Sequence, residues 1–140
     1  SDSTDGSGEL TLADIEYDSY TITVDDASVD VVEVCPSETL LLAPGTTETV
    51  DFTISAIAGN RLRVSVVNVG GDPVPGVDVR VEQASGYDET QTTGLCGQTF
   101  FSGGMSAATA TVTASRIGYT TTVTNNVDVH ASASVAVIIN

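Results

Sequence analysis

Val77-Asp78-Val79-Arg80-Val81 is the stretch that decides the fold, because valine alternates with a charged residue throughout it. A period of two is expected when one face of a β-strand is buried and the other meets water. The same alternation recurs at residues 20–24, 50–54 and 127–129, and no window has convincing helical spacing. The pattern therefore predicts an all-β chain of many short strands.

Turn-forming residues separate these runs. They include Pro44-Gly45, Gly59-Asn60, Pro75-Gly76 and Asn125-Asn126, residue types that tight turns favour. Short strands between regularly spaced turns are typical of a β-sandwich. A chain of 140 residues has room for one sandwich of ordinary size or two very small ones.

The chain is strongly acidic, with a formal net charge of −15, four arginines and no lysine. Four scattered cations cannot form the phosphate-neutralising cluster that nucleic-acid binding needs, and anionic membranes are disfavoured for the same reason. The absence of lysine also excludes Schiff-base chemistry and lysine-to-asparagine isopeptide bonds. An acidic surface suits solubility outside the cell, and adaptation to high salt is a second interpretation.

Cys35 and Cys96 lack the close spacing of a metal site, and His130 is the only histidine. A single disulfide is the favoured interpretation, and closing a loop of about 60 residues would stabilise the fold by roughly 4 kcal/mol. The alternative is a pair of buried free thiols.

An internal comparison suggests two units. Residues 4–55 are weakly similar to residues 93–140, although generic β patterning could produce the same match. We expect a β-rich segment at residues 1–60, forming a partial sandwich or second small unit, and a complete sandwich at residues 61–140. Bare sheet edges on the first unit would pair with another chain, unless Ser1 is an arbitrary cut in a longer protein.

Residues 62–66 (LRVSV) and 71–79 (GDPVPGVDV) resemble the opening of a carboxypeptidase regulatory-like domain, and they are equally similar to the B-type repeats of collagen adhesins. The similarity continues through residues 92–101, 110–114, 118–119 and 135–139. It implies a prealbumin-like or immunoglobulin-like sandwich that serves as a stalk, spacer, adhesin repeat or filament subunit.

The chain departs from the adhesin pattern because, without lysine, it cannot form the Lys–Asn staple of those repeats. The resemblance makes a Cys35–Cys96 bridge a plausible substitute. The contexts of these cysteines, together with Pro44-Gly45, also resemble extracellular domains carried behind type IV pilin-like export helices. No stretch approaches the roughly 20 apolar residues of a membrane span. The N-terminus lacks signal-peptide features, so an exported protein would be a processed or trimmed form.

The sequence contains candidates for three kinds of site. His130, which the alternation places on the same strand face as Asp128, is the one candidate for a histidine-dependent active site, but a solvated strand histidine is the simpler interpretation. Carboxylates at residues 14–18, 25–26 and 87–89 could converge on calcium, although the spacing of a calcium-binding loop is absent. Tyr17, Tyr87 and Asp88 are the candidates for glycan binding, with Tyr20 and Tyr119 assigned to the core.

These observations predict a non-enzymatic, extracellular or cell-surface module that is structural or adhesive, such as part of a pilus-like fibre or stalk. Its expected partners are copies of itself or other protein subunits, contacted through sheet edges, with no nucleic acid, no bilayer contact and no required cofactor. The alternative function is a carbohydrate-binding accessory module of a secreted protein.

Overall fold

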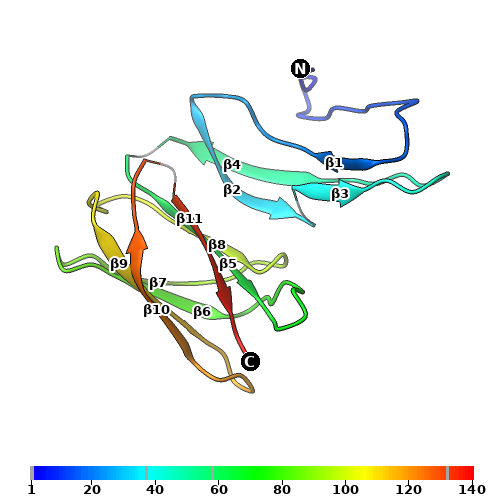
Figure 1. Cartoon of the computed structure of the whole chain (residues 1–140). Helices are drawn as coiled ribbons and strands as arrows, with labels where there is room; N and C mark the ends of the chain where they lie inside the picture. Colours follow the sequence, from blue (N-terminus) through cyan, green and yellow to red (C-terminus); the bar gives the residue numbers. More distant parts are fainter. Residues whose placement is uncertain (1, 37, 58, 132) are drawn as a thin grey trace.

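The computed structural model describes residues 2–36, 38–57, 59–131 and 133–140, and in these residues it contains eleven strands and no helix (Figure 1). The prediction of an all-β fold is confirmed. No helix that could cross a membrane occurs in the described part of the chain.

Residues 61–140 form two sheets. The first is four-stranded and antiparallel, in the order β10 (Thr122–Asp128), β9 (Thr109–Ser115), β6 (Asp78–Glu82) and β7 (Asp88–Thr92). The second is three-stranded, in the order β11 (Ala133–Ile138), β5 (Leu62–Val67) and β8 (Gln98–Phe101). In this sheet β11 is parallel to β5, and β8 is antiparallel to it.

The two sheets enclose one hydrophobic core. Alternate residues of the strands point into it and are almost completely buried, as the period of two predicts; they include Leu62, Val64, Val66, Val79, Val81, Phe101, Val112 and Val137. This is a β-sandwich, as the sequence predicts.

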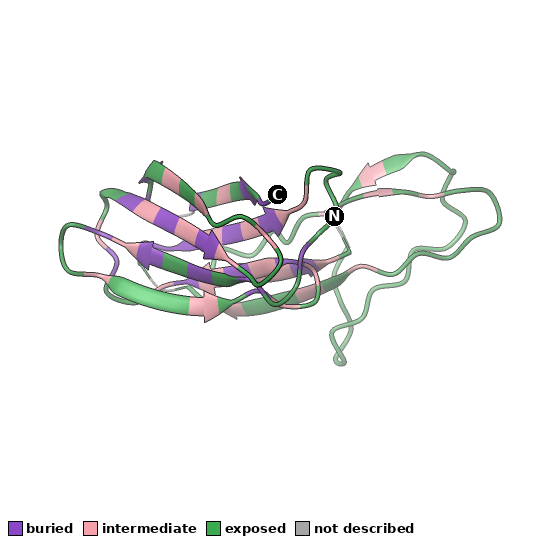
Figure 2. Ribbon diagram, turned by 90° about the horizontal axis from the view of Figure 1, so that it is seen from below, coloured by how far each residue is buried: buried purple, intermediate pink, exposed green. Residues whose placement is uncertain are grey.

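Residues 1–60 are organised differently. They form two separate antiparallel pairs, β1 (Ser19–Thr21) with β3 (Thr39–Leu41), and β2 (Val29–Cys35) with β4 (Asp51–Ala56). Among the described residues of this segment only Asp30 and Val34 are buried. Figure 2 shows the contrast, with the buried positions concentrated in the sandwich and the segment largely exposed.

The strands that the proposed internal repeat equates have different neighbours. Residues 20–24 overlap β1, which in the described chain pairs only with β3, whereas residues 110–114 lie in β9 between β6 and β10. Residues 50–54 overlap β4, antiparallel to β2, whereas residues 135–139 overlap β11, parallel to β5. The strands that the internal comparison matches therefore differ in their pairing. The period of two that any half-buried strand shows is enough to explain the weak sequence match.

The N-terminal segment covers part of the outer face of the three-stranded sheet, at β5 and β8, and leaves the outer face of β11 exposed. Leu62 and Val64 point into the core, so Arg61 and Arg63 share the opposite face of β5. Phe100, opposite Arg63 on β8, is on this outer face as well. β2 lies beside β8. The molecule thus has three layers over part of its length, and the outermost layer is thin.

Candidate functional site

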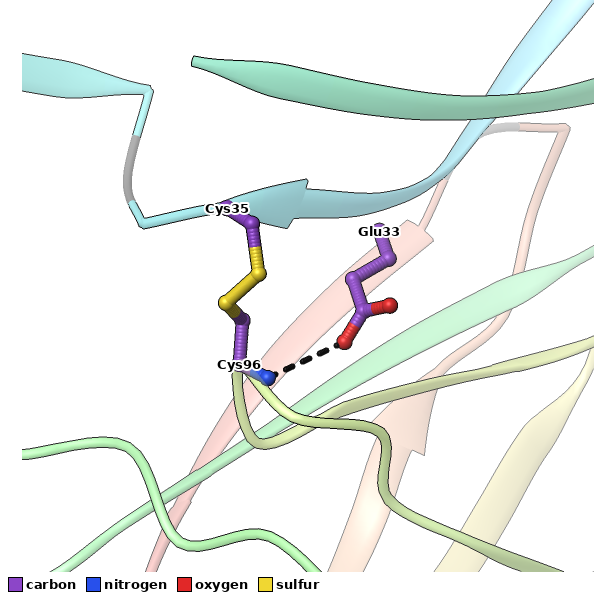
Figure 3. Close-up of side chains that lie close together, drawn as sticks. All are labelled: Glu33, Cys35 and Cys96. Atoms are coloured by element: carbon purple, nitrogen blue, oxygen red, sulfur yellow. Dashed lines mark hydrogen bonds between the residues drawn. A yellow bond between two sulfur atoms is a disulfide. The ribbon is translucent and has the colours of Figure 1, made fainter. Parts of the chain in front are cut away.

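The most highly organised polar region is the junction, defined here as the contacts of residues 30–36 and 38 with residues 61–63 and 94–98 of the sandwich. At its centre a disulfide joins Cys35 at the end of β2 to Cys96, with Cα atoms 5.6 Å apart (Figure 3). The two residues are 61 positions apart in the chain. The bridge ties the N-terminal segment covalently to the sandwich.

Glu33 accepts a hydrogen bond beside this bridge. Its carboxylate receives the backbone N–H of Cys96 at 3.2 Å (Figure 3). Gly94 leaves the room for it, since a Cβ at that position would lie 2.5 Å from Oε1 of Glu33. Glu33 therefore fixes the loop that presents Cys96.

Gln98 strengthens the attachment, because its side chain forms the two hydrogen bonds to β2 that a neighbouring strand would form. Its side-chain carbonyl accepts the Val34 N–H at 3.1 Å, and its side-chain amide donates to the Val34 carbonyl at 3.0 Å. One side chain thereby satisfies both backbone groups of a buried residue that would otherwise be costly to desolvate.

Two ion pairs complete the junction. Arg61 pairs with Asp30, and both side chains are at most 10% exposed. Arg63 pairs with Glu38 at 2.7 Å, in a more open position. The Oδ2 atom of Asp30 is the one buried side-chain nitrogen or oxygen in the described chain that has no hydrogen-bond partner.

A pocket of about 280 Å³ opens at these ion pairs, between the outer face of the three-stranded sheet and the N-terminal segment. Its polar wall contains Asp30, Glu38, Arg61 and Arg63. Its apolar wall consists of Ile22, Val24, Val29, Val31, Phe52, Phe100 and Ala133. The pocket combines charged and hydrophobic walls, and such a combination can bind a protein side chain as well as a small molecule.

The glycan candidates do not form one site. Tyr17 is 69% exposed and precedes β1, whereas Tyr87 and Asp88 lie at the β6–β7 hairpin. The Tyr87 ring packs against the core and its hydroxyl donates to Glu89, so Tyr87 is less available than the sequence suggests. Burial first, and then the Glu89 carboxylate, raise the pKa of Tyr87.

Asp88 is already engaged by Arg80. The guanidinium donates two hydrogen bonds to its carboxylate, at 2.8 and 2.7 Å, and also pairs with Glu82. A sugar at this position would have to displace a bidentate ion pair.

The acidic loops do not assemble a calcium site either. Within the described residues the one group of three close metal-ligand atoms is Glu33, Cys35 and Cys96, and both sulfurs are committed to the disulfide. Asp18 and Asp26 instead accept hydrogen bonds from the serines that follow them, Ser19 and Ser28. These carboxylates organise turns.

His130 is exposed and lies in an isolated bridge to the start of β5, where its carbonyl accepts the Arg61 N–H at 3.2 Å. Asp128, which the sequence placed on the same face, is also exposed. The contact that the structure gives His130 is thus a backbone hydrogen bond, with its side chain on the exposed surface.

Sequence reasoning counted Arg61 and Arg63 only among the four scattered cations, and it assigned no role to Asp30, Glu38 or Gln98. The sequence did contain a signal for a covered outer face. On that face of β5 and β8, Arg63 lies opposite the aromatic Phe100, and a large hydrophobic side chain there favours packing by a further layer. The alternation of buried and exposed residues, taken alone, predicted that this face would be exposed to solvent.

The comparisons with known proteins identify no family for this chain. No protein-family model matches the chain, and no curated protein matches it significantly. Among solved structures, the Bacillus anthracis TIE protein aligns with 71% of this chain at 15% sequence identity and a TM-score of 0.47. The alignment spans 20% of that protein, so this chain covers about one fifth of its length.

Proposed function

We propose that this chain is a non-enzymatic, extracellular structural or adhesive module that joins other subunits through its N-terminal segment. A disulfide across the junction supports an oxidising compartment such as the cell exterior. The sandwich supplies a stable base, and the segment held on it supplies the surface for contacts.

The observation that carries this proposal is the unpaired outer edge of β4. In the described chain β4 pairs only with β2, so its other edge leaves backbone N–H and C=O groups available to a further strand. The edge has no lysine or proline to block such pairing, and Ile54 on it is 52% exposed. Natural edge strands without these protections tend to associate.

Exposed apolar residues reinforce the same conclusion. Eight of the thirteen exposed large hydrophobic side chains in the described chain lie in the N-terminal segment: Leu10, Leu12, Ile15, Tyr17, Val24, Leu41, Ile54 and Ile57. Apolar residues gathered on one part of a surface are typical of a protein-protein contact.

Adding a charge at the edge tests the proposal. Ile54→Lys places an edge-protecting lysine on β4, and we expect self-association to weaken by about tenfold, or roughly 1.4 kcal/mol. Sedimentation velocity over a concentration series measures the effect. Val123→Lys is the matched control, since Val123 is 53% exposed on β10 and the substitution changes the charge equally. A wild-type chain that stays monomeric up to about millimolar concentration would contradict the proposal.

A further inference from the structure

Charge is divided very unevenly along the chain. Residues 1–60 contain thirteen acidic residues and no basic one, a net charge of −13, whereas residues 61–140 contain six acidic residues and four arginines, a net charge of −2. Two copies meeting through their N-terminal segments would bring the two acidic surfaces together. Electrostatics therefore favours contact between the segment of one copy and the sandwich of another.

One arginine of the sandwich is available for such a contact. Arg61, Arg63 and Arg80 each pair with a carboxylate, but the described chain provides none within ion-pair distance of Arg116. Its recorded contact is with the Tyr119 ring, 5.6 Å from the ring centre. Next to it Ile117 is 100% exposed, the highest value among the large hydrophobic residues described. Residues 116–119, called here the hairpin tip, thus present a free cation beside a bare apolar side chain.

The pocket at the junction has the complementary chemistry. The Glu38 side chain there is 41% exposed, so its carboxylate can accept a second guanidinium beside that of Arg63. Asp30 adds negative charge behind it, but its side chain is buried against Arg61. Phe52 and Val24 line the apolar side. A guanidinium and a branched aliphatic side chain would satisfy these two kinds of wall together.

The tip and the pocket lie at opposite ends of the sandwich. β11 starts at the pocket with Ala133 and Ser134, and the chain then ends at Asn140, whose carbonyl accepts the Thr120 N–H beside the tip. A strand of this length separates them by about 20 Å. Figure 1 shows the same arrangement, with the β9–β10 connection at the bottom and the N-terminal segment at the top.

We propose that the hairpin tip of one copy docks into the junction pocket of the next, with Arg116 facing Glu38 and Ile117 facing Phe52 and Val24. This inference rests on the proposed function and names the partner as a second copy of the chain. Because the two surfaces differ and lie at opposite ends, the contact is head-to-tail and can repeat into a filament.

Complementation between two defective variants tests the geometry. Arg116→Glu with Ile117→Ser destroys the tip and leaves the pocket intact. Ser134→Trp fills the pocket from an exposed position of β11 and leaves the tip intact. Each variant alone should associate at least tenfold more weakly than wild type. With Ile54→Lys added to both variants to weaken association through β4, an equimolar mixture should form a dimer and nothing larger, because only one intact tip-to-pocket pair can form per complex.

Circular dichroism and thermal melts verify that both variants remain folded, and the Val123→Lys chain should behave like wild type in the same mixtures. A tip variant that associates like wild type, or a mixture that yields no dimer, overturns the head-to-tail contact while leaving association through β4 in place. A monomeric wild-type chain overturns both proposals.

Discussion

The two regions of this molecule are stabilised in different ways. Residues 61–140 enclose a core of fully buried valines between two sheets, whereas the described part of residues 1–60 buries only Asp30 and Val34. The sandwich has enough apolar burial to fold around itself. The N-terminal segment depends on its attachment at the junction, through a disulfide, two ion pairs and the Gln98 side chain.

This difference has a functional meaning. A segment that buries little of its own apolar surface retains it for other partners, but it must be held in place to be useful. The junction performs that task, because it orders β2 without covering β4. Weakening the attachment should therefore separate the two regions, because the N-terminal segment depends on it and the sandwich does not.

The largest effect is expected from breaking the buried ion pair. Arg61→Ala leaves the Asp30 carboxylate buried without its partner, and loss of one member of such a pair typically costs about 3 to 5 kcal/mol. We expect the amides of β2 to lose protection from hydrogen exchange, while those of β6 and β9 in the sandwich keep theirs. Nuclear magnetic resonance measures both regions in one experiment.

The double variant Asp30→Val with Arg61→Met is its control. It removes both charges and keeps apolar volume, so most of the lost protection should return. If the single and double variants lose the same protection, the loss comes from the missing ion pair itself and not from a stranded Asp30 charge. Equal losses in β2 and β6 would show that the two regions unfold as one unit.

Removing the disulfide should have the next largest effect. Replacing Cys35 and Cys96 by serine releases a loop with a sequence separation of 61, and such a loss costs about 2 to 4 kcal/mol. We expect limited proteolysis to remove residues 1–60 first and to leave a resistant fragment near residues 61–140, identified by mass. Simultaneous loss of both regions would argue against a self-sufficient sandwich.

The sequence predicted the sandwich well and the junction poorly, for one physical reason. Alternation in β6 encodes which residues are buried between the sheets, and it is local. The outward Arg63 obeys the same alternation, yet it is covered by Glu38 from a segment 25 residues away. A local alternation pattern cannot predict that a distant segment of the chain will cover the outer face of a strand.

Tyr87 illustrates the same limit on a smaller scale. Beside Asp88 and Glu89 it has the composition of an exposed turn, and the sequence therefore proposes it as a ligand platform. In the hairpin, however, the Tyr87 carbonyl accepts the N–H of the buried Gln83, and this pairing brings the ring against the core. Cysteine pairing was easier to anticipate, since two cysteines allow only one intramolecular bridge.

The smallest effect should come from the exposed Arg80–Asp88 pair, which belongs to the sandwich alone. The Arg80 hydrogen bonds lower the pKa of Asp88, so its stabilising contribution is present above the ordinary aspartate pKa and is lost as the pH falls through the folded value. Arg80→Gln should return the Asp88 pKa toward normal in a carboxylate NMR titration. Asp26 is the internal reference, because Ser28 lowers its pKa within the N-terminal segment and this pKa should not change. A shift of both carboxylates would mean that the exposed charges of the two regions are coupled, and the separation between sandwich and segment would then be incomplete.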